Sequence, residues 1–429
     1  MVIVSQATRD GFNRKNPPMA DNAIQLDSGT GSRAVAMVDV PIQKGCNQPG
    51  SAALVRHDGD RDCFIDGWRG LFHLVLMADH LPFLLPSASI IFARWFEPLG
   101  YLSVAEGFVF LSGFVSGIVY TRVWRRQGSQ GVWRKVGKRV LTIYACYVLA
   151  VILLVLVVKA GGPSSVEWGK WQGLLDMPLM VVVLKVATLV YEPNFLEILP
   201  MYCLFLLGVP AAIQQLEEGR LFKIAFISIL IWVAAQLGIR GALTGLFSPW
   251  LVMQTGFFNS FGWQIVFVLG LLCGHKSFAA QGSWMPLNRK WVISAGILFV
   301  LFFLLRHHLV PVHVWPRLAD RSSLGPLRLV DFSCAAFLVS SFRGPLRKFV
   351  DWPGLAFLSR HSLQVFSFHL FPIYLVALAL AVTTTLPAVG QCLVMLFCLA
   401  SLFVIALLAG TSRYFQVGAF RPVAKGPDL

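Results

Sequence analysis

Long apolar runs separated by short polar segments cover the chain from about residue 65 to residue 410. A helix that spans a membrane needs about 20 consecutive, mostly apolar residues. About ten segments meet this requirement, and we predict spans at 65–86, 99–121, 139–159, 196–215, 221–239, 258–275, 291–309, 325–341, 361–383 and 388–410. The pattern therefore predicts an all-α, polytopic integral membrane protein.

Two parts of the chain depart from this pattern. Residues 1–60 are polar and contain neither a long apolar run nor a signal-peptide core, so we predict a disordered cytoplasmic leader. The run 174–190 is apolar but is interrupted by Pro178 and Lys185, which fits either a span or an interfacial or re-entrant helix. The membrane domain then covers residues 61–412, and residues 413–429 form a cytoplasmic tail.

Composition supports the membrane class and limits the partners. Of the 429 residues, 56% are hydrophobic and 13% are charged, whereas soluble domains contain about 25% charged residues. The formal charge is +15, but with both termini in the cytoplasm the inner segments carry roughly twice as many Lys and Arg residues as the outer ones. Topology therefore explains the charge without a nucleic-acid partner. The eight cysteines are scattered without a C-x-x-C motif, which indicates small buried hydrophobes and neither metal ligands nor a disulfide framework.

Two basic segments lie on opposite sides of the predicted membrane. The inner segment 121–139 follows the positive-inside rule, and Arg122 and Arg125 within it would also suit a phosphorylated donor. The outer segment 306–328 is rich in Arg and His. It is either an ordinary hydrated loop or a surface that binds a polar, anionic substrate.

The first predicted helix carries more ionisable groups than an inert span needs. Asp66, Arg69, His73, Asp79 and His80 fall within about four turns, and a charge at the centre of a bilayer costs on the order of 3 kcal/mol. Arg69 and His80 lie about three turns apart, so they share a face and are separated by roughly 16 Å along the axis. This spacing predicts a cation near the cytoplasm and an imidazole deeper in the membrane, where it can act as a general base. The alternative is a snorkelling Arg69 and a histidine satisfied in the core.

The second predicted helix supplies a carboxylate and several small residues. Glu106 lies near its outer end, where it either orients His80 or is exposed at the interface. Ser112, Gly113 and the small residues that follow permit close contact with another helix.

Several motifs follow one another in a fixed order. They are RDCFIDGWRG with the Arg69-x10-His80 spacing, AEGFVFLSGFVSGIVYTR (105–122), LEILPMYCLFLLGVP (196–210), FNSFGWQIVFVLGLLCG (258–274), LGPLRLV (324–330) and SRHSLQVFSFHLF (359–371). On these motifs the chain resembles the OpgC family, a branch of the membrane acyltransferase-3 superfamily, over about residues 61–385. One departure concerns the late motif, where Ser359 precedes Arg360 in place of the family's usual glycine.

The resemblance implies a bacterial inner-membrane enzyme without a permanently bound cofactor. Such an enzyme takes an acyl group, succinyl in the namesake activity, from cytoplasmic acyl-CoA and places it on a hydroxyl of a periplasmic glucan or another glycan outside. By motif position His80 is the catalytic histidine and Arg69 its partner. The other site residues that the resemblance implies are Asp66, Gly70, Glu106, Ser112, Arg360, Ser362 and Gln364.

A transporter or flippase is the competing class, because such proteins also keep ionisable groups within the membrane. The sequence shows no clear inverted repeat of interrupted helices, which argues modestly against it. The two classes differ in whether labelled acyl groups from acyl-CoA reach an outer glycan.

Overall fold

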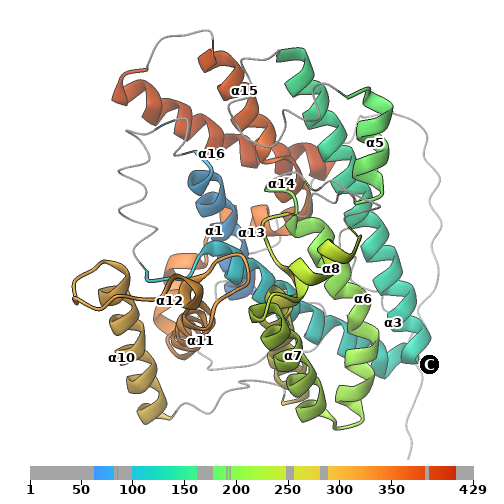
Figure 1. Ribbon diagram of the computed structural model, residues 1–429, viewed down its shortest axis with the longest axis vertical. Coiled ribbons are helices and arrows are strands. Elements are labelled where there is room, and N and C mark those ends of the chain that lie inside the picture. The colour runs from blue at the N-terminus through green and yellow to red at the C-terminus, as the bar shows by residue number, and fades with distance from the viewer. Residues whose placement is uncertain are drawn as a thin grey trace, which may run out of the picture. The chain divides into compact units, whose positions relative to one another are not determined.

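The computed structural model describes residues 62–81, 85, 99–161, 177–189, 192, 195–247, 256–280, 288–381 and 386–411. Their regular structure is helical throughout, without strands (Figure 1). The helices in chain order are α1 (Cys63–Asp79), α3 (Val104–Gly161), α5 (Leu179–Ala187), α6 (Ile198–Glu217), α7 (Leu221–Gln236), α8 (Ile239–Phe247), α9 (Ser260–Ala279), α10 (Arg289–Arg306), the short 3₁₀ helix η2 (Pro316–Ala319), α11 (Pro326–Ser341), α12 (Arg343–Val350), α13 (Pro353–Arg360), α14 (Ser362–Phe368), α15 (Leu370–Ala381) and α16 (Ala388–Thr411). The all-α prediction is confirmed for this part of the chain.

The described helices support a membrane protein. Five of them are long and apolar enough to cross a membrane, and the number rises to seven if each of two bent pairs is one span. These pairs are α7 with α8, bent by 70°, and α11 with α12, bent by 89°. The number of about ten spans and the cytoplasmic termini stay predictions. The leader 1–60 and the tail 413–429 lie outside the described residues.

The segment predicted as a loop between the second and third spans is helical. In α3 the only non-helical backbone is at Gly128, whose φ of 64° lies in the left-handed region that favours glycine. The neighbouring Arg, Lys and Gln side chains are good helix formers, so both helices extend to this single kink. Figure 1 shows the two halves of α3 diverging from the kink, and the prediction of a loop over 121–139 is therefore wrong.

The first half of α3 crosses α9 at very short range. A Cβ atom on Gly113 would lie 2.0 Å from the carbonyl oxygen of Phe267, and one on Gly274 would lie 2.0 Å from that of Phe114. Both helices thus need glycine where their backbones meet. The predicted close contact of the small residues in this helix is confirmed.

The helix α5 covers only a short part of the apolar run 174–190. It has nine residues, fewer than the roughly 20 that a span needs. Pro178 is its N-cap, and Leu189, with a φ of 58°, follows its C-cap. Within the described residues, this run favours the interfacial or re-entrant alternative over a span.

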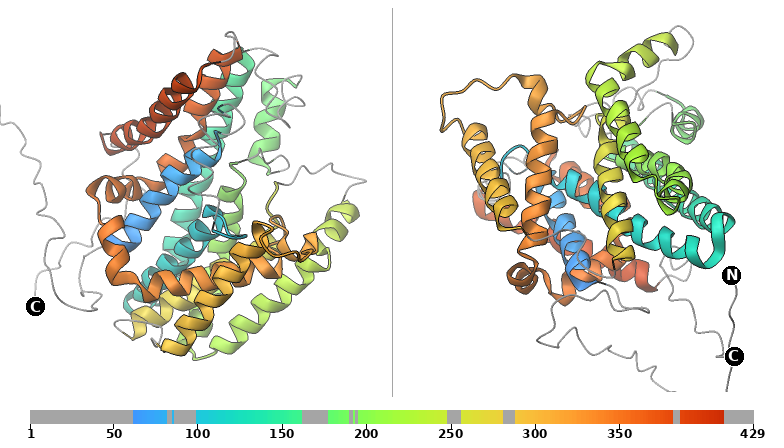
Figure 2. Two further views of the ribbon diagram at one scale, coloured as in Figure 1. Left: turned by 90° about the vertical axis from the view of Figure 1, so that its left-hand side faces the viewer. Right: turned by 90° about the horizontal axis from the view of Figure 1, so that it is seen from below.

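The first helix packs against elements from the far end of the chain. Its neighbours are α13, α3, α16, α12 and α14 (Figure 1, Figure 2). A Cβ atom on Gly67 would lie 2.2 Å from the Val350 carbonyl oxygen, and one on Gly70 would lie 2.1 Å from that of Leu355. The two glycines of the DGWRG motif therefore let α12 and α13 approach the backbone of α1.

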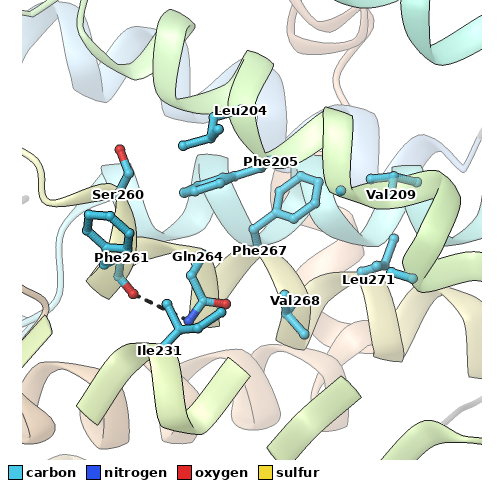
Figure 3. A pocket seen from close by; sticks show the side chains of 12 residues that line it. Leu204, Phe205, Val209, Ile231, Ser260, Phe261, Gln264, Phe267, Val268 and Leu271 are labelled. Atoms are coloured by element: carbon cyan, nitrogen blue, oxygen red, sulfur yellow. Dashed lines mark hydrogen bonds between the residues drawn. The ribbon is translucent and has the colours of Figure 1, made fainter. Parts of the chain in front are cut away.

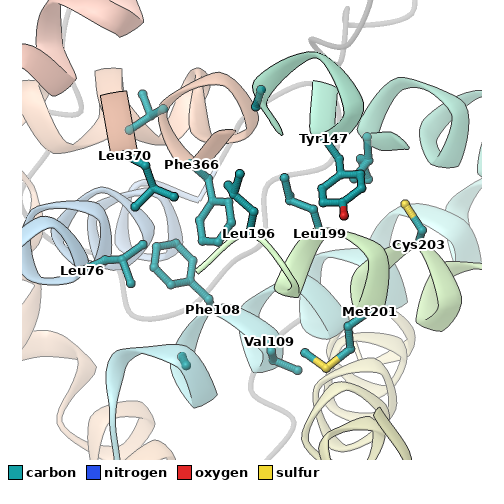
Figure 4. Close-up of a cluster of buried hydrophobic side chains, with 14 of the residues drawn as sticks. Leu76, Phe108, Val109, Tyr147, Leu196, Leu199, Met201, Cys203, Phe366 and Leu370 are labelled. Carbon is teal, nitrogen blue, oxygen red and sulfur yellow. The ribbon is translucent and has the colours of Figure 1, made fainter. Parts of the chain in front are cut away.

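A hydrophobic core joins these elements. Figure 4 shows Leu76 of α1 beside Phe108 of α3 and Phe366 of α14, with Leu370 nearby. The rings of Phe108 and Phe366 are 5.9 Å apart in an edge-to-face arrangement. This core fixes α1, α3 and α14 against one another and so determines what the polar side chains of α1 can reach.

Candidate active site

A polar stripe, defined by Asp66, His73 and His80, runs along one face of α1. Successive members are about two turns apart and therefore share a face. His73 and His80 are buried among apolar helices, at 2% and 6% exposure, whereas Asp66 is partly buried. Arg69 is partly buried one turn after Asp66 and lies within electrostatic range of His73. Because α1 is continuous up to Asp79, the helical spacing expected between Arg69 and His80 is confirmed.

The stripe faces hydroxyl groups on the α13–α14 segment. The Ser359 hydroxyl donates to Asp66 Oδ1 at 2.8 Å, and Ser362 Oγ lies 2.8 Å from His73 Nε2. Ser362 was among the implied site residues, whereas Ser359 stood out only as a departure from the family motif. These contacts join positions 293 and 289 residues apart in the chain, which local sequence patterns do not encode.

Two aromatic rings lie close to His80 at the C-terminal end of the stripe. The centroid of its ring lies 4.2 Å from that of Phe195 and 5.3 Å from that of His369. Arg321 is within electrostatic range of His80, and its Nη2 lies 3.8 Å from Asp79 Oδ2. Neither His369 nor Arg321 was among the site residues predicted from the sequence. The signal for His369 is a lone histidine in the apolar part of the late motif.

Arg321 is held by an ordered turn within the segment 306–328. The indole Nε1 of Trp263 donates to the carbonyl oxygens of Arg321 and Ser322 at 3.1 and 3.0 Å. Trp263 itself is fully buried on α9. This part of the segment is therefore not an ordinary hydrated loop, and its binding of a substrate stays a prediction.

A second set of hydrogen bonds stabilises the same turn. Burial alone would raise the pKa of the Asp320 carboxyl. The pKa is nevertheless below its ordinary value, because the carboxylate accepts hydrogen bonds from the Ser323 hydroxyl and from the backbone N–H groups of Ser323 and Ser322. The positive charge of Arg328 lowers the pKa of Asp320 further. The carboxylate accepts the Ser323 N–H at 2.7 Å and the Ser323 hydroxyl at 2.5 Å. Asp320 thus stays ionised at neutral pH and closes the turn that presents Arg321.

Glu106 is completely buried near the start of α3, where its partner is Arg328. Arg328 Nε and Nη2 donate to Glu106 Oε1 at 3.0 and 2.6 Å. The backbone N–H and the hydroxyl of Ser103 donate to Oε2 at 2.9 and 2.5 Å. With 0% exposure, Glu106 is not exposed at an interface. Its contacts within the described residues favour a structural role over orienting His80.

Asp331 extends this buried contact between α3 and α11. Its Oδ2 accepts the backbone N–H groups of Tyr101 and Leu102 at 2.7 and 3.2 Å. Its Oδ1 is buried without a hydrogen-bond partner among the described residues. The carboxylate thus anchors the segment that leads into α3.

The cationic candidates Arg122, Arg125 and Arg360 lie nearer the surface. Arg122 and Arg125 stack over the Phe278 ring at 5.6 and 5.3 Å, and Arg125 also makes two hydrogen bonds of 3.1 Å to Glu217. Arg360 is exposed at the end of α13. These side chains are accessible to a large anionic ligand, while the contacts recorded for them involve no residue of the stripe.

Two polar candidates occupy different helices. Ser112 is partly buried on α3, next to the contact with α9. Gln364 is 8% exposed on α14, the helix that carries Ser362. The structure therefore brings Gln364, and not Ser112, onto the helix that faces the stripe.

A cavity of about 260 Å³ lies between α6, α7 and α9 (Figure 3). Phe205, Phe267 and Leu271 contribute to its mainly apolar wall. The side-chain amide of Gln264 donates to the Ser228 carbonyl oxygen at 2.7 Å, so this polar group is already satisfied. No residue of the stripe lines the cavity, and we do not assign the chemistry to it.

The described residues contain no group of three or more His, Cys, Asp or Glu side chains that could hold a metal ion. The free thiols, most of them buried, are those of Cys146, Cys203, Cys273, Cys334, Cys392 and Cys398. Cys63 is disulfide-bonded, so the interpretation of the cysteines as buried hydrophobes outside a disulfide framework is wrong for Cys63.

Comparison with known proteins gives a family. The family model described as OpgC protein matches residues 61–414, which include every residue of the stripe and the histidine that faces it. No curated protein and no solved structure matches the chain. The match begins where the polar leader ends and continues to the end of α16, so the chain belongs to the OpgC family.

Proposed function

We propose that this protein is a transmembrane O-acyltransferase of the bacterial inner membrane. It moves an acyl group, succinyl in the first instance, from cytoplasmic acyl-CoA to a hydroxyl of a periplasmic glucan or another glycan. The observation that carries the proposal is the polar stripe of α1, which leads from the partly buried Asp66 past Arg69 to the buried His80. Membership of the OpgC family supports a glucan-modifying acyltransferase.

The donor enters from the cytoplasmic side. Its nucleotide phosphates dock against the basic residues of 121–139, because Arg and Lys are the usual partners of phosphate. Its pantetheine arm extends along α1 past Arg69, where the Ser359 and Ser362 hydroxyls offer polar contacts. The thioester then reaches the level of His80.

The transfer itself needs one base and one donor for the developing charge. His80 removes the proton from the glycan hydroxyl while the hydroxyl oxygen attacks the thioester carbonyl. A C–O bond forms, the C–S bond breaks, and His80 returns the proton to the thiolate of CoA. Arg321 Nε, buried without a partner among the described residues, is available to donate to the oxyanion. Phe195 shields His80 from water, which strengthens these interactions.

The test is acyl transfer in a reconstituted system. The full chain in proteoliposomes, with labelled succinyl-CoA or acetyl-CoA on one side and a glucan on the other, should give labelled glucan that is identified by mass spectrometry. His80→Ala should abolish the label without changing the amount of folded protein in the membrane. Movement of unmodified glycan without acylation would identify a transporter and overturn the proposal.

A further inference from the structure

His369 occupies the position beside His80 that sequence reasoning gave to Glu106. The two ring centroids are 5.3 Å apart and the ring planes are inclined by 32°. Imidazole rings that share an N–H···N hydrogen bond edge to edge have their centroids at about this separation. In the structure no hydrogen bond joins the two rings, although their centroids lie at the separation that such a bond requires.

The tautomer of His369 follows from its own backbone contact. Its Nδ1 lies 2.5 Å from the carbonyl oxygen of Phe366. A carbonyl oxygen only accepts, so Nδ1 carries the proton and the neutral ring presents a lone pair at Nε2. The position of this histidine between α14 and α15 brings its ring within reach of that carbonyl oxygen.

The Nε2 atom of His369 is an acceptor without a donor. It is buried, the residue is 2% exposed, and none of the described residues donates a hydrogen bond to it. A buried polar atom of this kind is costly unless a partner arrives during function. The side chains of Phe366 and Phe195, which pack against the two histidines, are aromatic rings without a hydrogen-bonding group.

The carboxylates of Glu106 and Asp79 already have partners. Glu106 accepts hydrogen bonds from Arg328 and Ser103, and Asp79 lies beside Arg321. His80 becomes an imidazolium when it removes a proton, and its second N–H then needs an acceptor. Among the described residues, His369 Nε2 is the acceptor that the geometry offers.

We propose that His369 is the positioning residue for His80, an inference that rests on the proposed acyl transfer. The hydroxyl proton moves to one ring nitrogen of His80, while the N–H at the other ring nitrogen donates to His369 Nε2. The C–O bond forms, the C–S bond breaks, and the proton returns from His80 to the thiolate, so His369 keeps its own proton throughout. The Phe366 carbonyl oxygen orients His369 as His369 orients His80.

Two substitutions of similar length separate the acceptor from the bulk of the ring. His369→Met fills the space without a strong acceptor, and His369→Gln places an amide oxygen near the position of Nε2. We expect kcat to fall roughly 100-fold in His369→Met, with the KM values for acyl-CoA and glucan within about threefold of wild type. His369→Gln should restore kcat to within about tenfold of wild type.

The inference is overturned if kcat falls equally in folded His369→Met and His369→Gln. It is also overturned if kcat does not fall in His369→Met. If His369→Met does not fold, His369→Gln alone decides the matter, because a folded Gln variant as inactive as His80→Ala also overturns it. His275→Gln on α9 is the matched control, since His275 is also a largely buried histidine, at 9% exposure against 2% for His369, and lies 3.0 Å from Thr121 Oγ1. His275→Gln should keep kcat within about twofold of wild type. If its kcat falls as far as that of His369→Met, the loss comes from disturbed packing of a buried histidine in general, and the inference is overturned.

The outcome for His369 can be told apart from that for the proposed function. Wild-type protein that transfers no acyl group removes the proposed function, whatever the His369 variants do. If the wild-type protein transfers the acyl group and needs His80 but not a hydrogen-bond acceptor at position 369, the proposed function stands. Only the positioning role of His369 is then overturned. Combining His369→Met with His80→Ala should lower the residual rate no further than His80→Ala alone, because the two residues act as one unit.

Discussion

The Glu106–Arg328 pair and the imidazole pair of His80 and His369 are both buried contacts between helices far apart in the chain. They differ in how completely their hydrogen bonds are formed. Both oxygens of Glu106 accept hydrogen bonds from Arg328 and Ser103. His369 Nε2 has no donor among the described residues, and His80 touches it without a hydrogen bond.

This difference indicates which buried polar groups stabilise the fold and which serve a reaction. A saturated ion pair has no capacity left for a substrate, and breaking it leaves an uncompensated charge in an apolar interior. An unsaturated imidazole weakens the resting structure but keeps an acceptor available. From the sequence alone His80 was the candidate base and Glu106 a candidate for orienting it, and their partners in the structure separate the two residues.

His80→Ala is expected to give the largest effect on activity. Removal of the base should lower acyl transfer by roughly 10³-fold or more, with little change in thermal stability. Labelled glucan formation and the unfolding temperature in detergent, measured on the same preparation, check this. Full activity in the folded variant would show that His80 is not the base. The His80–His369 pair would then differ from the Glu106–Arg328 pair without serving the reaction.

Glu106→Ala should give the largest effect on stability. Arg328 cannot lose its proton, so the variant buries an unpaired charge, at a cost of about 3–5 kcal/mol. Thermal unfolding in detergent measures the loss, and a second change, Arg328→Met, should recover most of it. A Glu106→Ala protein with wild-type stability and a kcat as low as that of His80→Ala would instead place Glu106 in the catalytic machinery.

Arg69→Ala should have an intermediate effect, on donor binding. Loss of one charge-assisted contact corresponds to about a tenfold rise in the KM for acyl-CoA and to a smaller stabilisation of the protein by acyl-CoA. Arg347→Ala is the control, because Arg347 pairs at the surface with Asp351, one turn later on the chain. If the two variants bind the donor equally well, Arg69 has no role in positioning it.

Arg125→Ala should have the smallest effect. Its ion pair with Glu217 is largely solvent-accessible, with side-chain exposures of 46% and 17%, and such pairs contribute about 0–1 kcal/mol. We expect an unchanged unfolding temperature and less than about a threefold rise in the KM for acyl-CoA, measured by thermal unfolding and steady-state kinetics. A larger rise in KM would show that the pair opens to bind the donor.

Several features of the fold could be predicted because they depend on neighbours along the chain. The length of the hydrophobic runs predicted the all-α membrane class. The small residues around Gly113 predicted the close contact that α3 makes with another helix. Helical phase placed Arg69 and His80 on one face of the first helix. The loop predicted between the second and third spans was wrong because charge does not prevent a helix, and only Gly128 breaks it.

The sequence by itself determined that the first helix carries several ionisable side chains, with Arg69 and His80 on one face, and that the chain has the membrane composition of its class. Only the tertiary structure decided which of these side chains are buried and which groups they meet. His73 contacts a serine 289 residues away, His80 faces His369, and Glu106 pairs with Arg328, 222 residues away. Periodicity fixes the direction of a side chain relative to its own helix axis, whereas its partner depends on how distant helices pack. Tertiary packing therefore decides that Glu106 has all its hydrogen bonds formed, whereas the imidazole of His369 keeps an acceptor without a donor among the described residues.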